Sequence, residues 1–127
     1  SKRSVTLNLH TEEGRAIFLR LAAETDVVIE SYRPGQLAAW GIGYDVLSRE
    51  HPDLILASIT PFGQTGPWRD YKGWEALITA KTGVMHEKRG LTRRPGPAYI
   101  SFPYASWGAA QAAVQAILAA RRARPTS

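Results

Sequence analysis

The chain has no cysteine among its 127 residues, so disulfide bonds, thiolate metal sites and a cysteine nucleophile are excluded. It also has no apolar run that approaches the roughly 18 residues of a membrane-spanning helix. The first residues, SKRSVTLNLH, are basic but lack the apolar centre of a secretory signal. We therefore expect a cytoplasmic protein that does not enter a membrane and holds no metal.

Acidic residues are scarce in the last third of the chain. Residues 86–127 contain seven lysines and arginines but a single acid, Glu87, whereas residues 1–85 contain nine basic and ten acidic residues. A pI near 9.9 is typical of nucleic-acid-binding proteins. The basic residues, however, fall in a loop and at a predicted helix end, with no helix-turn-helix, zinc or RNP pattern around them. Because cations also favour a helix C-terminus, we expect no nucleic acid among the partners.

The spacing of apolar residues predicts alternating strands and helices. Two short apolar runs, residues 26–30 and 54–59, are typical of buried parallel strands. Residues 5–9 alternate apolar with polar and indicate a short strand or an extended lead-in, while residues 86–101 have no regular pattern. Helices are predicted at 12–24 after an N-cap at Thr11, at 34–41 between Pro34 and Gly41, at 45–50, at 74–82 and at 105–122.

This order of elements predicts an α/β fold, a partial Rossmann-like parallel sheet with flanking helices that ends in a long Ala-rich helix. The sheet is expected to be incomplete, because only two strands and one edge segment are evident and no GxGxxG turn is present. Both predicted strands run into loops rich in Pro, Gly and polar side chains, SYRPGQ (31–36) and ITPFGQTGP (59–67). Such loops at strand ends are where α/β proteins bind ligands.

Six segments of the chain, in order, resemble motifs of the family III CoA-transferases, the group that includes formyl-CoA transferase and the carnitine and bile-acid CoA-transferases. They are KRSVTLNL (2–9), VIESYRPG (28–35), WGIGY (40–44), HPDLILASITPFGQTGP (51–67), GWEAL (73–77) and SWGAAQAAVQAILAARRAR (106–124). The resemblance implies that residues 1–127 are a fragment of the larger, Rossmann-like domain of such an enzyme, without its first strand and without its smaller domain.

The resemblance also implies a ligand and partners. The substrates would be an acyl-CoA and a small carboxylic acid, and the assembly would be an interlocked homodimer or a pairing with a second half. Residues implied at the CoA site are Ser31, Tyr32, Arg33, Lys72 and Trp74, and cations suit the phosphates of CoA. Core packing is the alternative role for the two aromatic residues, and an ordinary exposed position is the alternative for the two cations.

The family's reaction depends on an aspartate at the start of the last helix, and Ser106 stands at that position here. In the family this carboxylate attacks the thioester, carries CoA as an aspartyl thioester and passes it to the acceptor acid. A serine hydroxyl would need a base and would form an oxyester, which is poorly suited to returning CoA. The alternative role of Ser106 is the N-cap of the helix. Glu75, in GWEAL, is the second residue with an implied catalytic role, and Trp74 beside it excludes the racemases of the superfamily.

Two functions stay open on the sequence. The first is a CoA-transferase in which Ser106 leaves this copy inactive unless a second half or a partner completes the site. The second is a non-catalytic acyl-CoA-binding or dimerisation domain of a tandem or paired transferase. A second copy of the same motifs in one reading frame, with an aspartate at the helix start, would favour the first.

Overall fold

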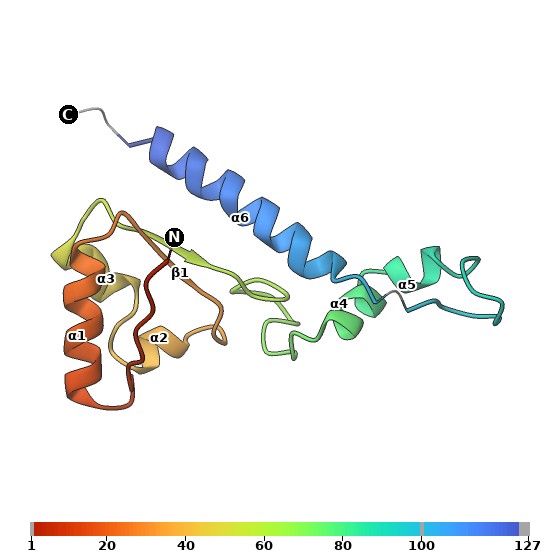
Figure 1. Ribbon diagram of the computed structural model, residues 1–127, viewed down its shortest axis with the longest axis horizontal. Helices are drawn as coiled ribbons and strands as arrows, with labels where there is room; N and C mark the ends of the chain where they lie inside the picture. The colour runs from red at the N-terminus through yellow and green to blue at the C-terminus, as the bar shows by residue number, and fades with distance from the viewer. Residues whose placement is uncertain (1, 100, 125–127) are drawn as a thin grey trace.

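The computed structural model describes residues 2–99 and 101–124 and shows an α/β fold (Figure 1). Its strands, β1 (Val27–Glu30) and β2 (Ile55–Ser58), pair in parallel, with Val27 opposite Ile55 and Glu30 opposite Ser58. The crossover between them runs through two short helices, α2 (Gln36–Ala39) and α3 (Tyr44–Glu50). The predicted α/β class with a parallel sheet is therefore confirmed.

Helix α1 (Glu12–Ala23) begins where the sequence predicts. Thr11 is its N-cap, and the Thr11 hydroxyl accepts a hydrogen bond from the backbone N–H of Gly14 at 3.1 Å. A side chain at Gly14 would collide with the backbone, because a Cβ there would lie 2.0 Å from the carbonyl oxygen of Asn8. The tight turn that joins the lead-in to α1 therefore requires glycine.

Residues 5–8 have no regular secondary structure and Leu9 begins a turn, so no strand forms in this segment. Leu7 and Leu9 are half-buried while Thr6 and Asn8 are exposed, but Val5 is 65% exposed, so the predicted alternation of faces holds only from Thr6 to Leu9. The apolar side chains of this segment border a small hollow together with Phe18 of α1. Of the two predicted alternatives, the short strand does not form, and the segment is a lead-in to α1.

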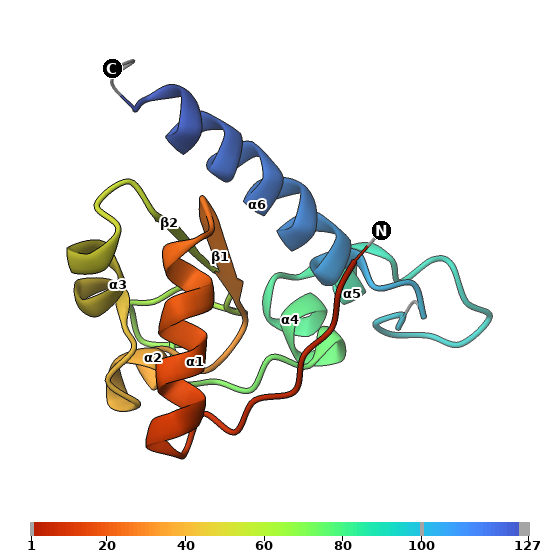
Figure 2. The same ribbon diagram turned by 60° about the vertical axis from the view of Figure 1, so that its left-hand side comes forward.

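The hydrophobic core lies where α1 and α3 meet the sheet. Ala22, Leu47 and Leu54 are almost fully buried, and four half-buried side chains pack against them: Phe18, Leu19, Val28 and Leu56. Burying a leucine contributes about 1.5–3 kcal/mol, so this cluster holds the two helices on the strands. Figure 2 shows α1 and α3 together, with α6 running well apart from them.

Helix α6 (Tyr104–Arg122) links the sheet to a second region made of α4 (Glu75–Lys81) and α5 (Val84–Glu87) (Figure 1). It contacts both β2 and α4, yet none of its residues is buried. Several large apolar side chains of α6 are exposed, Trp107, Val114 and Leu118 among them. Among the described residues, no helix combines the length and the apolar character needed to cross a membrane.

Two predictions about helix starts are wrong, and a third element, α5, reaches into a segment predicted to be irregular. Helix α2 begins at Gln36, after Gly35 with φ 80°, so Pro34 does not open it. This left-handed backbone is one that glycine adopts readily and that stops a helix from starting earlier. Helix α5 overlaps the segment predicted to be irregular, residues 86–101, only at His86 and Glu87, and Ile100 of that segment lies outside the described residues. Helix α6 starts after Pro103, so Ser106 is its third residue and not its N-cap.

Candidate functional site

A cavity of about 970 Å³ opens where the two strands end. Its wall is built from residues 31–34 after β1, residues 59–61 after β2, residues 69–74 before α4 and the first turns of α6. A volume of this size lies at the upper end of the range of small-molecule sites. Its position at the carboxyl ends of parallel strands is where open α/β sheets bind ligands.

Ser106 lines this cavity. The five residues implied at the CoA site also line it: Ser31, Tyr32, Arg33, Lys72 and Trp74. They come from the end of β1, the segment before α4 and the start of α6, which are far apart in the sequence. The fold therefore brings them together at one surface. Their role as CoA ligands stays a prediction.

Two aromatic side chains of the cavity wall present accessible faces. Tyr32 is 45% exposed and Trp74 is 65% exposed, which argues against core packing for either. The Tyr32 ring meets Trp40 edge-on with centroids 5.0 Å apart, and its backbone N–H donates to Glu30 Oε2 at 2.6 Å. The Nζ atom of Lys72 lies 4.9 Å from the centroid of the Trp74 ring. Accessible rings of this kind can stack on a flat heterocycle such as adenine.

Positive charge predominates on the cavity wall. Arg33, Arg69 and Lys72 line it, against one carboxylate, that of Asp70. The Nε atom of Arg69 lies 3.4 Å from Asp70 Oδ1. Because both side chains are well exposed to solvent, this pair contributes less than about 1 kcal/mol. The excess of cations favours an anionic ligand, and guanidinium groups are matched to phosphate oxygens.

An aromatic cluster holds the loop that carries these cations. The rings of Trp68 and Tyr71 lie nearly parallel with centroids 6.5 Å apart, and Phe62 meets both of them edge-on. The Nζ atom of Lys81, on α4, lies 4.8 Å from the Trp68 centroid and 4.9 Å from the Tyr71 centroid. Each cation–π contact of this kind contributes about 0.5–1 kcal/mol. The cluster therefore fastens residues 69–72 to α4.

The carboxylate of Glu75 lies at the start of α6. Its Oε1 accepts a hydrogen bond from the backbone N–H of Ala105 at 2.6 Å, and its Oε2 accepts from the backbone N–H and the hydroxyl of Ser106 at 3.2 and 2.9 Å. Pro103, the N-cap residue, offers no side-chain hydrogen bond. Glu75 therefore pairs two of the N–H groups that every helix start leaves without an intrahelical partner.

These hydrogen bonds keep Glu75 ionised. The bond from Ala105 is the largest influence, and together with those from Ser106 it lowers the pKa of Glu75 below its ordinary value of 4.5, against a smaller opposing effect of desolvation. Hydrogen bonds from donors favour the charged form of a carboxylate. At neutral pH the start of α6 therefore carries a full negative charge, supplied by a residue of α4.

Some parts of the cavity wall were not predicted from the sequence. Arg69 and Asp70 line it, and so do the small residues 108–110 of α6. A run of Gly and Ala on a helix next to a binding motif was the available signal, since small side chains leave room for a ligand beside the helix. In the part of the chain that the structure describes, no group of three or more His, Asp or Glu side chains is placed to hold a metal ion.

Comparison with known proteins finds CoA-transferases. The chain is 48% identical over 86 residues to the succinyl-CoA–L-malate CoA-transferase beta subunit of Chloroflexus aurantiacus, a match that covers 68% of this chain and 21% of the relative. It is 40% identical over 101 residues to the human succinyl-CoA:glutarate CoA-transferase, covering 77% of this chain and 23% of the relative.

Solved structures resemble the fold closely. A CAIB/BAIF family protein from Brucella suis superposes with a TM-score of 0.82 and 39% identity, over 93% of this chain and 31% of that one. A hypothetical protein from Mycobacterium tuberculosis superposes with a TM-score of 0.83 and 34% identity, over 92% of this chain and 33% of that one. The chain thus spans about a fifth of the length of the curated relatives and about a third of the solved chains.

The family assignment rests on the whole chain. The profile of CoA-transferase family III matches residues 1–127. The predicted motifs, the relatives by sequence and the relatives by structure all agree with that match. The chain belongs to CoA-transferase family III.

Proposed function

We propose that the protein moves CoA between an acyl-CoA thioester and a small carboxylic acid, and that the cavity at the strand ends holds the CoA part of the donor. One observation carries the proposal. Residues from separate segments, implied at the CoA site by their motifs, line a single cavity together with Ser106. The names of two relatives, which pair succinyl-CoA with L-malate or with glutarate, suggest the first acids to test.

Each part of the cavity wall suits one part of this ligand. The cations Arg33, Arg69 and Lys72 bind phosphate oxygens, and an arginine does so with two parallel hydrogen bonds. The exposed rings of Tyr32 and Trp74 stack on the adenine. The thioester end then points toward the start of α6, where the ionised carboxylate of Glu75 lies.

The proposal includes a paired assembly in the cytoplasm. The exposed apolar side chains of α6, Trp107, Val114 and Leu118, form a surface that a monomeric protein seldom leaves open. Some relatives are named as alpha and beta subunits. We expect the full-length gene product to form an interlocked homodimer or to pair with a second half. A monodisperse monomer in size-exclusion chromatography with light scattering would contradict this part.

An exchange assay tests the function. The full-length gene product is incubated with succinyl-CoA and, in turn, L-malate, glutarate and acetate, and each new acyl-CoA is quantified by mass spectrometry. We expect transfer to at least one acid and a loss of about tenfold in kcat/KM on Arg33→Ala, since a charge-assisted hydrogen bond contributes about 1.5–3 kcal/mol. Lys88→Ala, a cation outside the cavity wall, is the matched control and should leave the rate unchanged.

A second function is favoured by one observation, the serine at the position of the family aspartate. In this alternative the cavity binds acyl-CoA without chemistry, and the chain supports an active partner. The two functions give different results in the same experiment. Binding of CoA with no exchange of any acid, and with no intermediate on the protein, would establish the non-catalytic alternative.

A further inference from the structure

The family comparison does not explain why the carboxylate of Glu75 lies beside Ser106, at the position of the family aspartate. Ser106 carries none, but the Ser106 hydroxyl donates a hydrogen bond to Oε2 of Glu75 at 2.9 Å. Glu75 thus lies one hydrogen bond away from the residue that replaces the family aspartate. Glu75 is not itself among the residues that line the cavity, but Ala105 and Ser106, which hold its two oxygens, both line it.

The reaction itself indicates which kind of group can act here. In CoA transfer the acceptor is a carboxylate that becomes a thioester. A carboxylate of the protein can undergo the same exchange, so each half of the reaction is chemically like the whole and no step is steeply downhill. A serine ester is a different functional group, and an aliphatic hydroxyl gives up its proton to an ionised carboxylate only at a large energetic cost.

We propose that Glu75 is the nucleophile of this chain, with Ser106 as the hydrogen-bond donor that holds it at the start of α6. The proposal rests on the proposed function of CoA transfer. The three hydrogen bonds occupy three of the roughly four lone-pair positions of a carboxylate. The remaining position is on Oε1, which accepts one hydrogen bond among the described residues.

The steps balance without any further reactant. Oε1 of Glu75 attacks the thioester carbonyl carbon, a C–O bond forms, the C–S bond breaks, and a mixed anhydride and CoA thiolate result. The thiolate attacks the carboxyl carbon of Glu75, the donor acid leaves as its carboxylate, and a glutamyl-CoA thioester remains. The acceptor carboxylate then attacks this thioester and releases the thiolate, which attacks the acceptor's carbonyl carbon. The products are the new acyl-CoA and the free carboxylate of Glu75.

Asp70 is the competing carboxylate at the cavity. It belongs to the loop before α4 and pairs with Arg69 at 3.4 Å, and its side chain is 82% exposed. Among the described residues it makes no hydrogen bond or ion pair with α6, so the positive end of the helix dipole does not support it. Glu75 is bound to that end directly, and a helix start stabilises an anionic oxygen both in the resting carboxylate and in the intermediate formed from it.

Trapping locates the nucleophile. The full-length gene product is incubated briefly with succinyl-CoA and no acceptor, and hydroxylamine then converts an activated carboxyl group into a hydroxamate that peptide mass spectrometry maps. We expect the hydroxamate on Glu75 in the wild-type protein. It should be absent in Glu75→Gln and unchanged in Glu87→Gln, whose carboxylate, on α5, pairs with Arg89 and accepts no hydrogen bond from α6 among the described residues. Glu75→Asp retains a carboxylate and should regain part of the label.

The outcomes separate this inference from the proposed function. A hydroxamate on Asp70, or a succinyl ester on Ser106, would overturn the assignment to Glu75. CoA transfer by Glu75→Gln at the wild-type rate would also overturn the assignment to Glu75. Each of these three results would leave the proposed function of CoA transfer intact. A wild-type protein that exchanges no acid would instead overturn the proposed function. The label on the wild-type protein does not depend on whether any variant folds.

Discussion

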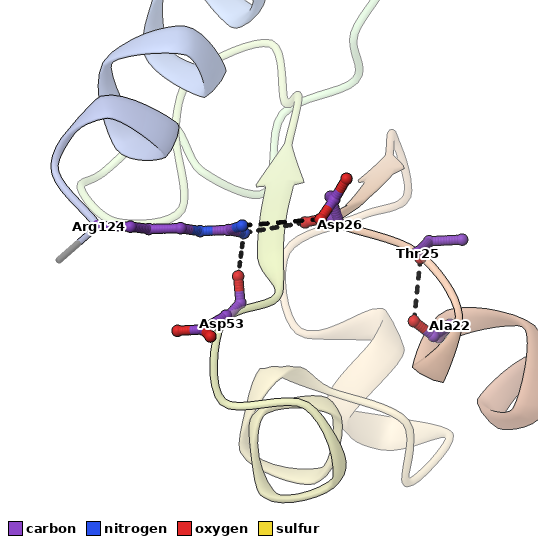
Figure 3. Close-up of polar contacts among 5 residues, drawn as sticks. All are labelled: Ala22, Thr25, Asp26, Asp53 and Arg124. Atoms are coloured by element: carbon purple, nitrogen blue, oxygen red, sulfur yellow. Dashed lines mark hydrogen bonds and ion pairs between the residues drawn. The ribbon is translucent and has the colours of Figure 1, made fainter. Parts of the chain in front are cut away.

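The two ends of helix α6 are held by side chains of opposite charge. At its start, the carboxylate of Glu75 accepts hydrogen bonds from backbone N–H groups. Just past its end, the guanidinium of Arg124 donates to the carbonyl oxygens of Asp26, at 3.2 Å, and of Asp53 (Figure 3). Arg124 also lies 3.8 Å from the carboxylate of Asp26. Both contacts have the sign that the helix dipole favours.

The surroundings of the two ends differ. Asp26 and Asp53 precede β1 and β2, so Arg124 fastens α6 to the edge of the sheet where the strands begin. Glu75 holds the other end beside the cavity, where the strands finish. One electrostatic rule thus gives two outcomes: a structural tie at one end and, in our account, a reactive group at the other.

The largest expected effect concerns activity. Glu75→Gln should lower kcat/KM for CoA transfer by on the order of 10⁴-fold, because removing a nucleophile abolishes the covalent route. Arg124→Ala should leave the transfer rate of the folded protein within about threefold of the wild type, since a residue that only stabilises the fold contributes nothing to the transition state. Steady-state exchange kinetics measure both. Equal losses in the two variants would contradict the division of roles.

The next effect concerns stability. Arg124→Ala should lower the free energy of unfolding by about 2 kcal/mol, because it removes hydrogen bonds from a charged group to two carbonyl oxygens. Arg122→Ala, an exposed arginine in the last turn of α6, is the matched control and should stay within about 0.5 kcal/mol of the wild type. Urea unfolding followed by circular dichroism compares them. A similar loss of unfolding free energy in both variants would show that the net charge of the helix end, and not the hydrogen bonds of Arg124 to Asp26 and Asp53, stabilises the protein.

A smaller effect separates capping from chemistry at the start of α6. Pro103→Asp places a capping carboxylate at the N-cap, where it can accept from the N–H groups that Glu75 holds in the wild type. In the Glu75→Gln background it should restore about 1 kcal/mol of stability, the usual value of an N-cap side chain. The transfer rate should stay lost. Recovery of activity by this double variant would mean that Glu75 acts only as a cap.

The smallest effect is a pH dependence confined to one end of the helix. Because its pKa is lowered in the folded protein, Glu75 adds stability that is fully present above the ordinary value of 4.5 and is lost as the pH falls through the lowered pKa. The difference in urea midpoint between wild type and Glu75→Gln should therefore narrow as the pH falls from 7 toward 3. The guanidinium of Arg124 stays charged throughout, so the Arg124→Ala difference should not follow the same course.

Local patterns predicted most of the regular elements. Thr11 identified the start of α1, because an N-cap hydroxyl bonds to a backbone N–H only three positions later, here that of Gly14. The short apolar runs identified β1 and β2, but the full burial typical of such strands is not present, since no residue of either strand is buried and Ile29 is exposed. The start of α6 was predicted to within one residue, but its capping group was not, because that group is a side chain 30 residues earlier in the sequence. No local pattern contains such a partner.

For the candidate site, the sequence identified several residues but not the contacts between them. Tyr32, Lys72 and Ser106 were identified through motifs, and the fold then placed them on one cavity wall. The sequence did not predict the cation–π contacts of Lys81 with Trp68 and Tyr71, because the position of a lysine on a helix does not indicate which rings it will contact. Glu75 was identified as a residue of interest, but its hydrogen bond to Ser106 depends on how α4 and α6 pack and could not be derived from spacing.

The measurement that tests the central claim most directly is calorimetric titration of the full-length gene product with CoA. If the cavity at the strand ends is the CoA site, the wild-type protein binds CoA and Lys72→Ala binds it about tenfold more weakly, a difference of about 1.4 kcal/mol. Lys88→Ala, outside the cavity wall, binds like the wild type. No binding at millimolar CoA, or the same weakening in both variants, would contradict the assignment of the cavity to CoA.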